Sequence, residues 1–145
     1  MEWKRIGLAL ALGIVATTSA AAQSPDEAAV RAAVEHYLQG HATGDGAHHK
    51  LVFHDVANLF WIDGTALRTR TGAEYIAGSS GKPAADEARR KRWIEKVDVT
   101  GTAATAKVIL DYPTVRFTDY FALLKVGGEW KIVTKVFHRE SKPAP

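Results

Sequence analysis

The sequence contains no cysteine among its 145 residues, which excludes disulfide bonds, thiolate metal ligands and a thiol nucleophile. It also has little excess charge: 19 Lys and Arg against 16 Asp and Glu leave a formal net charge of +3. That surplus is too small to predict a nucleic-acid partner. The one basic run, residues 89–92, follows Asp86 and Glu87 at helical spacing, which predicts local ion pairs. The remaining composition, 46% hydrophobic and 24% charged, is typical of one globular domain.

Long hydrophobic runs are also lacking. The longest, Ile6 to Ala16, covers 11 residues, whereas a spanning helix needs roughly 20. It follows Lys4 and Arg5 and precedes small residues that end at Ala22, the layout of a secretory signal peptide. We therefore expect a signal peptide over residues 1–22, cleavage after Ala22, and a secreted or periplasmic protein without membrane attachment after cleavage.

Helix signals come first in the expected mature chain. Residues 24–27 supply a serine cap, a first-turn proline and two acids, all typical of a helix start. An apolar stripe at helical spacing follows, formed by Val30, Val34, Tyr37 and Leu38. Gly40 is the predicted end of this helix. Asp45 then predicts a second, shorter helix that runs to about Phe53.

From Val56 onward the pattern changes to strands. Asp63-Gly64 separates residues 57–62 from residues 65–70, which predicts a hairpin. Thr71 and Glu74 have the spacing of a capping box, so a short helix is expected there. After a polar loop over residues 78–90, four strands are predicted at 93–99, 103–112, 117–126 and 130–138. The folded domain is placed at residues 23–140 and a disordered tail at 141–145.

Helices followed by strands predict an α+β fold, with the first helix lying across a mostly antiparallel sheet of six strands. Strict alternation gives the last two strands two apolar faces each: Tyr120, Ala122 and Leu124 opposite Phe121 and Leu123, and Trp130, Ile132 and Val136 opposite Val133 and Phe137. One layer of helices covers only one face. A second copy of the chain is therefore expected on the other face, as a homodimer through the sheet.

Three stretches of the sequence carry a family resemblance: residues 37–40 with 43–45, residues 53–54 with 57–59, and residues 118–121 through 130–138. Their order resembles the nuclear-transport-factor-2-like superfamily, in which a curved sheet wraps around a long helix as an open cone. Within it the chain is more similar to one branch, the putative lumazine-binding family of small bacterial proteins, over residues 26–139. The resemblance implies a cone-shaped pocket that binds a small ligand.

The same superfamily includes ketosteroid-isomerase-like and SnoaL-like enzymes, which use an inward-facing aspartate base with tyrosine donors. Tyr37 matches the place of such a donor, but Trp61 occupies the usual aspartate position and cannot abstract a proton. Whether the protein is an enzyme is therefore left open, with His54 and Asp119 as candidate bases. The first alternative is a ligand-binding protein. The second is a SnoaL-like isomerase, lyase or hydrolase that acts on a small carbonyl or polyketide-like compound. The third is a non-catalytic dimerisation or scaffold module, in which large inward side chains such as Phe60 and Trp61 would fill the cone.

Aromatic side chains with a polar tip suit a planar or amphipathic ligand. The predicted ligand-binding residues are Tyr37, His54, Trp61, Tyr112, Tyr120 and His138. Asp119 shares a strand face with Phe117 and Phe121, and is expected to pair with Arg116 or Lys135 at the subunit interface. Five of the six histidines lie between His36 and His54 without sharing a helix face, so neither a metal nor another cofactor is expected.

Overall fold

The computed structural model describes residues 24–143, so the expected signal peptide lies outside the described residues. The elements in chain order are α1 (Pro25–Thr43), α2 (Gly46–Val52), β1 (Phe53–Asp63), β2 (Ala66–Thr71), α3 (Gly72–Ala77), a 3₁₀ turn (Glu87–Arg89), β3 (Lys91–Thr100), β4 (Ala103–Asp111), β5 (Val115–Val126) and β6 (Glu129–Ser141). Within these residues, no helix combines the length and the hydropathy that crossing a bilayer requires.

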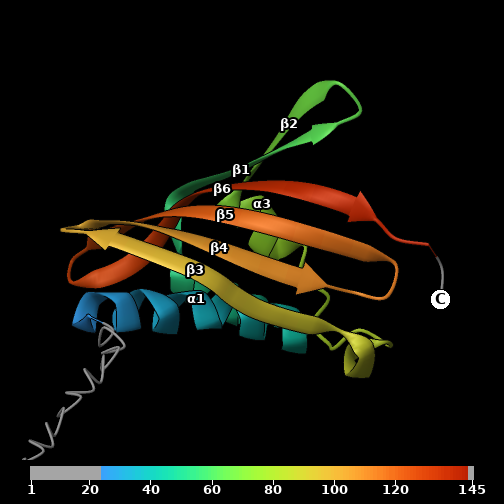
Figure 1. Ribbon diagram of the computed structural model, residues 1–145, viewed down its shortest axis with the longest axis horizontal. Helices are drawn as coiled ribbons and strands as arrows, with labels where there is room; N and C mark the ends of the chain where they lie inside the picture. The colour runs from blue at the N-terminus through green and yellow to red at the C-terminus, as the bar shows by residue number, and fades with distance from the viewer. Residues whose placement is uncertain (1–23, 144–145) are drawn as a thin grey trace, which may run out of the picture.

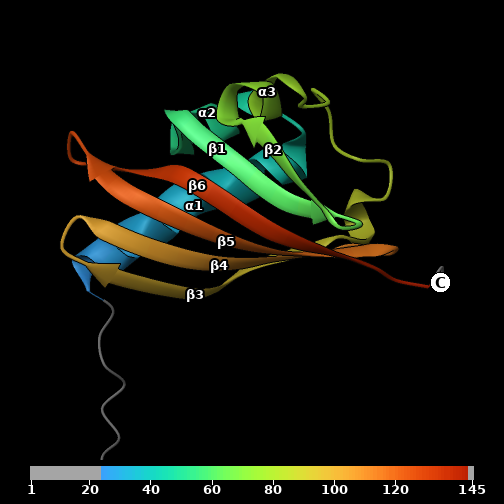
Figure 2. The same cartoon turned by 90° about the horizontal axis from the view of Figure 1, so that it is seen from above.

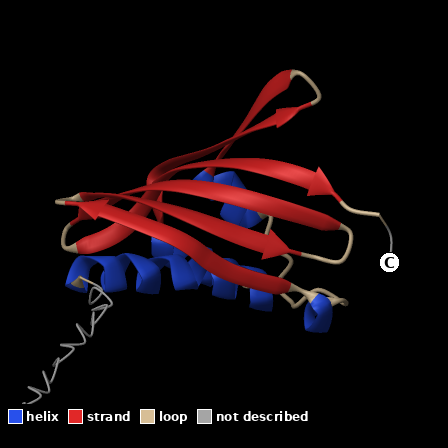
Figure 3. Cartoon of the chain, viewed as in Figure 1, coloured by secondary structure: helices blue, strands red, loops and turns tan. Residues whose placement is uncertain are grey.

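The strands form one curved sheet in the order β2-β1-β6-β5-β4-β3. Every neighbouring pair is antiparallel except β1 and β6, which run parallel. Helix α1 lies across one face of the sheet (Figures 1 and 3), while α2 and α3 gather beside β1 (Figure 2). The predicted α+β cone is confirmed, and the core lies between α1 and the concave face of the sheet.

Local sequence signals form the helix starts as expected. Ser24 caps α1 by accepting a hydrogen bond from the Glu27 amide, and Asp45 caps α2 in the same way through Ala47. Thr71 and Glu74 form the complete capping box of α3. The hairpin turn between β1 and β2 places Gly64 at φ +62°, a conformation that glycine adopts without steric cost.

The sequence predicts that helix α1 ends at Gly40, and this prediction is wrong. The helix continues to Thr43, and Gly44 at φ +72° closes it by donating its amide to the Gly40 carbonyl. Gly40 is instead the point where α1 meets α2. A Cβ atom there would lie 2.3 Å from Nε2 of His49, so the absence of a side chain lets the imidazole ring pack directly against the helix.

A β-bulge in β6 reverses the expected facing of its second half. Leu123 pairs with Ile132 and Ala122 pairs with Thr134, so Val133 is the extra residue. Beyond the bulge, Lys135 is buried and Val136 is 44% exposed. The prediction that Val136 shares one face of the strand with Trp130 and Ile132 is therefore wrong, because strict alternation holds only in an unbroken strand.

The predicted disordered tail begins too early. Strand β6 extends through Ser141, and the Lys142 amide donates to the Thr114 carbonyl at 2.8 Å. The Lys142 ammonium also donates to the Asp111 carboxylate and to the Tyr112 carbonyl, both at 2.9 Å. Ordered contacts thus reach Lys142, while residues 144–145 lie outside the described residues.

The contact at Gly40 predicts a specific cost of adding one methyl group. Gly40→Ala should lower the free energy of unfolding by about 1–3 kcal/mol, because overpacking against the His49 ring outweighs the gain in helix propensity. The measurement is urea unfolding followed by circular dichroism. Gly78→Ala is the matched control: Gly78 has φ −79°, a Cβ there meets nothing closer than 3.5 Å, and its stability should change by less than about 1 kcal/mol. Equal effects of the two substitutions would contradict the packing argument.

Candidate functional site

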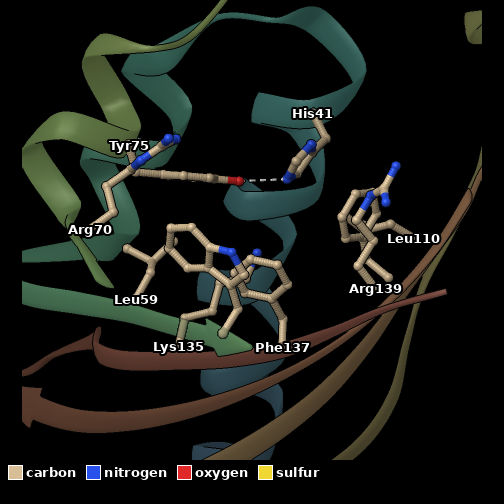
Figure 4. Close-up of a pocket in the computed structure, with 10 residues that line it drawn as sticks. His41, Leu59, Arg70, Tyr75, Leu110, Lys135, Phe137 and Arg139 are labelled. Carbon is tan, nitrogen blue, oxygen red and sulfur yellow. Dashed lines mark hydrogen bonds between the residues drawn. The ribbon is translucent and has the colours of Figure 1, made fainter. Parts of the chain in front are cut away.

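A cavity of about 340 Å³ opens between the concave face of the sheet and helices α1 and α3. Its walls are mostly apolar, with cationic side chains at the rim and on the floor (Figure 4). The lining residues come from every strand but β3: His41, Leu59, Trp61, Arg70, Tyr75, Leu110, Phe117, Lys135, Phe137 and Arg139. The size lies within the range of small-molecule sites.

A buried polar cluster lies at the floor of this cavity. Lys135 and Asp119, both nearly inaccessible to solvent, form an ion pair with 3.0 Å between Nζ and Oδ2. The Tyr37 hydroxyl bridges them: it donates to Oδ2 of Asp119 and accepts from Nζ of Lys135, each at 2.5 Å. Helix α1 and strands β5 and β6 thus meet in one charged contact inside an apolar core.

Aromatic rings surround the Lys135 ammonium. Its Nζ lies 4.8 Å from the ring centroids of both Tyr37 and Phe137 and 5.3 Å from that of Tyr75. These distances are typical of cation–π contacts. Burial nevertheless lowers the pKa of Lys135 below its usual value, while the Asp119 carboxylate opposes that shift. Burial and the Asp119 charge together raise the pKa of Tyr37 well above its usual value, so the Tyr37 phenol stays protonated.

Two neutral histidines lie above this cluster. Burial and the charge of Lys135 lower the pKa of His41 well below its usual value. The pKa of Tyr75 is raised by burial, so we assign the 2.8 Å contact between them as the Tyr75 hydroxyl donating to Nε2 of His41. Burial lowers the pKa of His49 to about 4, and its Nε2 donates to the Tyr37 carbonyl at 3.2 Å.

His41, Tyr75 and Arg70 also line a second, more polar cavity of about 240 Å³. Its other walls come from the α1–α2 junction and the loop after α3: Gly40, Gly44, His49, Gly78, Ser79, Ser80, Lys82, Ala84 and Arg90. Neither cavity has an aspartate or glutamate among its described lining residues. Arg70 and Lys82 have no carboxylate within salt-bridge distance among residues 24–143. The hydrogen-bonded pair of His41 and Tyr75 thus lies between the mostly apolar main cavity and the more polar second cavity.

Comparison with known proteins assigns the family. A family model described as "Putative lumazine-binding" matches residues 25–138. The chain belongs to this family. A nuclear-transport-factor-2-like protein from Shewanella baltica OS155 has 27% identity and a TM-score of 0.72, with 81% of this chain and 95% of that chain covered. One from Methylobacillus flagellatus KT has 30% identity and a TM-score of 0.68, with 81% and 94% covered.

A short match to a curated protein is also present. The aldolase FrzH of a Cladobotryum species is 34% identical over 50 residues, which make up 33% of this chain and 40% of FrzH. The chain therefore matches less than half the length of that relative. The family and the fold together support a small-ligand-binding role for this member of the lumazine-binding family.

Of the six predicted ligand-binding residues, Trp61 lines the main cavity and Tyr37 lies directly beneath it, bonded to Lys135. Tyr120 points to the opposite face of the sheet and is 48% exposed. His138 lies on the same outer face, because the bulge at Val133 reverses the facing of the residues after it.

The other two predicted residues lie outside both cavities for local reasons. Tyr112 is buried, and Cζ of Arg90 lies 4.3 Å from the centroid of the Tyr112 ring. The Tyr112 hydroxyl accepts a hydrogen bond from Arg92. His54 accepts from the Val56 amide at 3.3 Å, beside the start of β1. Phe60 alternates with the inward-facing Leu59 and Trp61 and so faces outward, which leaves the cone open rather than filled.

Asp119 does pair with Lys135, as predicted, but inside the cone of one subunit and not at a subunit interface. Sequence reasoning missed Lys135, Tyr75 and Arg70 as cavity residues. Lys135 was hidden by the bulge, which no glycine or proline marks. The position of Arg70 could have been predicted from the hairpin. Arg68 and Arg70 lie on one face of β2, and Arg68 is the cross-strand partner of Trp61.

The buried ion pair predicts strongly non-additive effects of substitution on stability. Asp119→Leu leaves the Lys135 cation without its counter-charge and should lower the free energy of unfolding by about 3–5 kcal/mol, as should Lys135→Met. The double variant removes both charges and should recover at least about 2 kcal/mol of that loss. Urea unfolding measures all three.

The half-exposed pair of Glu95 and Lys107 is the control for these variants. Glu95→Ala should cost less than about 1 kcal/mol, because solvent screens an exposed ion pair. If Asp119→Leu cost no more than Glu95→Ala, the buried ion pair would not stabilise the fold as argued above.

Proposed function

We propose that this protein is an exported binding protein that holds a planar aromatic molecule bearing an anionic group. The observation that carries the proposal is an apolar chamber whose rim cations, Arg70 and Arg139, have no carboxylate partner among residues 24–143, and whose described lining residues include no aspartate or glutamate. Membership of the lumazine-binding family supports a small ligand. The nature of that ligand is inferred from the chemistry of the walls.

The planar part of the ligand follows from two aromatic side chains. The rings of Trp61 and Phe137 lie with centroids 5.4 Å apart and planes 23° apart, and both line the cavity. Together with Leu59, Leu110 and Phe117 they give a flat, apolar wall. Offset stacking on such a wall favours a flat ring system over a globular aliphatic one.

The anionic group of the proposed ligand is inferred from the arginine side chains at the rim of the cavity. Arg70 lines both chambers, and its Cζ lies 5.9 Å from the centroid of Trp61. Arg139 lies at the other side of the apolar chamber and bonds only the Ser141 hydroxyl within residues 24–143. A guanidinium without a carboxylate partner is suited to bind a carboxylate or phosphate in two parallel hydrogen bonds.

A homodimer through the outer face of the sheet is part of the same proposal. Phe60, Val136 and Tyr120 form one cross-strand row on β1, β6 and β5, on the face that no helix covers (Figure 1). Tyr120 and Val136 are 48% and 44% exposed. An apolar row of this kind on an open sheet favours burial against a second copy. Export rests on the sequence of residues 1–22.

A second candidate is catalysis on a small carbonyl compound. The observation that favours it is the amine of Lys135, which lines the cavity and is held in a buried cluster with Asp119 and Tyr37. FrzH, which is similar over part of its length, is named an aldolase, and aldolases act on carbonyl compounds.

The ligand class is tested with two probes of equal shape, 2-naphthoate and neutral 2-naphthamide. The naphthoate should bind about tenfold more tightly, a difference of ~1.4 kcal/mol, because only it carries the charge that the rim cations attract. Arg70→Gln should abolish most of this preference, and Trp61→Ala should weaken both probes. Isothermal titration calorimetry measures each dissociation constant.

Arg68→Gln is the matched control, since Arg68 lies two residues away on β2, pairs with Asp63 and lines neither cavity. It should leave both affinities unchanged. Equal affinity for the two probes would exclude the anionic ligand, and the absence of binding by either would exclude the aromatic one.

Native mass spectrometry of the protein recovered from an exporting bacterial host tests export and dimerisation together. The expected species is a dimer of chains that begin at Gln23. Val136→Glu should shift it to monomer, whereas Leu51→Glu, which alters an even more exposed apolar residue on α2, should not. A monomer with its first 22 residues intact would overturn both parts.

A further inference from the structure

Among the described residues, Lys135 is the lysine that is both buried and part of the cavity lining. The bulge at Val133 turns its side chain into the cone, where it lines the floor of the apolar chamber. Most of the other described lysines have solvent-exposed side chains, and Lys125 and Lys107, for example, pair with surface carboxylates. A side chain that only neutralised Asp119 would have no need to face an open cavity.

We propose that the Lys135 amine forms a reversible imine with the carbonyl group of a small aromatic aldehyde or ketone bound in the cavity. The step rests on the ligand site of the proposed function. The ammonium and the carbonyl compound give an iminium ion and one molecule of water: the C–N double bond forms, the carbonyl oxygen leaves as water, and the positive charge stays on Nζ. No oxidant, reductant or cofactor is required.

The surroundings of Nζ stabilise the product as well as the starting state. The iminium nitrogen occupies the place of the ammonium, 3.0 Å from the Asp119 carboxylate and within 4.8 Å of the centroids of Tyr37 and Phe137. The cost of burying one cation is therefore met before the reaction begins. The aromatic wall formed by Trp61 and Phe137 receives the ring of the carbonyl compound.

Proton transfer has a path within the cluster. Attack requires the neutral amine, and the burial that lowers the pKa of Lys135 increases its population. Asp119 accepts the proton through Oδ2, and its second oxygen, Oδ1, is buried without a hydrogen-bond partner within the described residues. In this step Oδ2, which lies 3.0 Å from Nζ, holds the proton and returns it to the carbinolamine hydroxyl, which then leaves as water. Tyr37 stays protonated and orients both groups.

The test is reductive trapping with 6-formyl-2-naphthoate and sodium cyanoborohydride at neutral pH. Hydride reduces the imine to a stable secondary amine, which adds to the chain the mass of the aldehyde less one oxygen atom. Peptide mass spectrometry locates the adduct. We expect Lys135 to be modified at least tenfold faster than exposed Lys125, and excess 2-naphthoate to protect Lys135 alone. Lys135→Arg should keep the cation and lose the adduct, while Lys125→Arg should retain it.

The outcomes separate this inference from the proposed function. If 2-naphthoate binds but adducts form only at exposed lysines, Lys135 is a structural cation and the imine is overturned, while the ligand site stands. If an adduct at Lys135 forms without protection by 2-naphthoate, the reaction does not occur in the cavity and the inference also fails. If 2-naphthoate does not bind and Lys135 is not modified, both proposals fail. Because the adduct is mapped on the unaltered protein, the result does not depend on how well any variant folds.

Discussion

A lysine inside an apolar cone must be neutralised where it lies, and the arrangement of this protein follows from that constraint. Lys135 on β6 needs Asp119 on β5, and the Tyr37 hydroxyl on α1 bridges the two. Because the bridging phenol belongs to the helix, the position of α1 along the sheet is set by a directional hydrogen bond. Apolar packing alone tolerates small shifts of a helix, whereas a buried charge does not tolerate the loss of its partner.

The same cluster determines the character of the cavity above it. Burial, reinforced by the charge of Lys135, lowers the pKa values of His41 and His49, so these rings stay neutral and act as hydrogen-bonding partners of Tyr75 and of the backbone. The charges accessible to a ligand are then those of the rim, above all Arg70 and Arg139. Such a site selects ligands by the shape of its apolar walls and by the positive charge of the arginines at its rim.

Short-range chemistry made much of this fold predictable from the sequence. The caps at Ser24 and Asp45, the hairpin at Asp63-Gly64 and the capping box of α3 each depend on neighbouring residues alone. The sequence predictions were wrong where contacts between distant segments determine the local structure. Gly40 was taken for a helix end because its packing partner, His49, comes from another helix. The bulge at Val133 depends on pairing with β5 and has no local marker, so the sequence pattern does not predict Lys135 as a cavity residue and predicts the wrong face for His138.

The strand order has a consequence for how the chain folds. The last strand, β6, lies in the middle of the sheet and joins the β1–β2 hairpin on one side to β5 and its neighbours on the other. Until β6 is in place, the hairpin has no partner strand, and the contacts between β1 and β6 span most of the sequence. Closure of such distant contacts is entropically slow. A chain still emerging from the ribosome therefore cannot complete this sheet until its last strand has been synthesised.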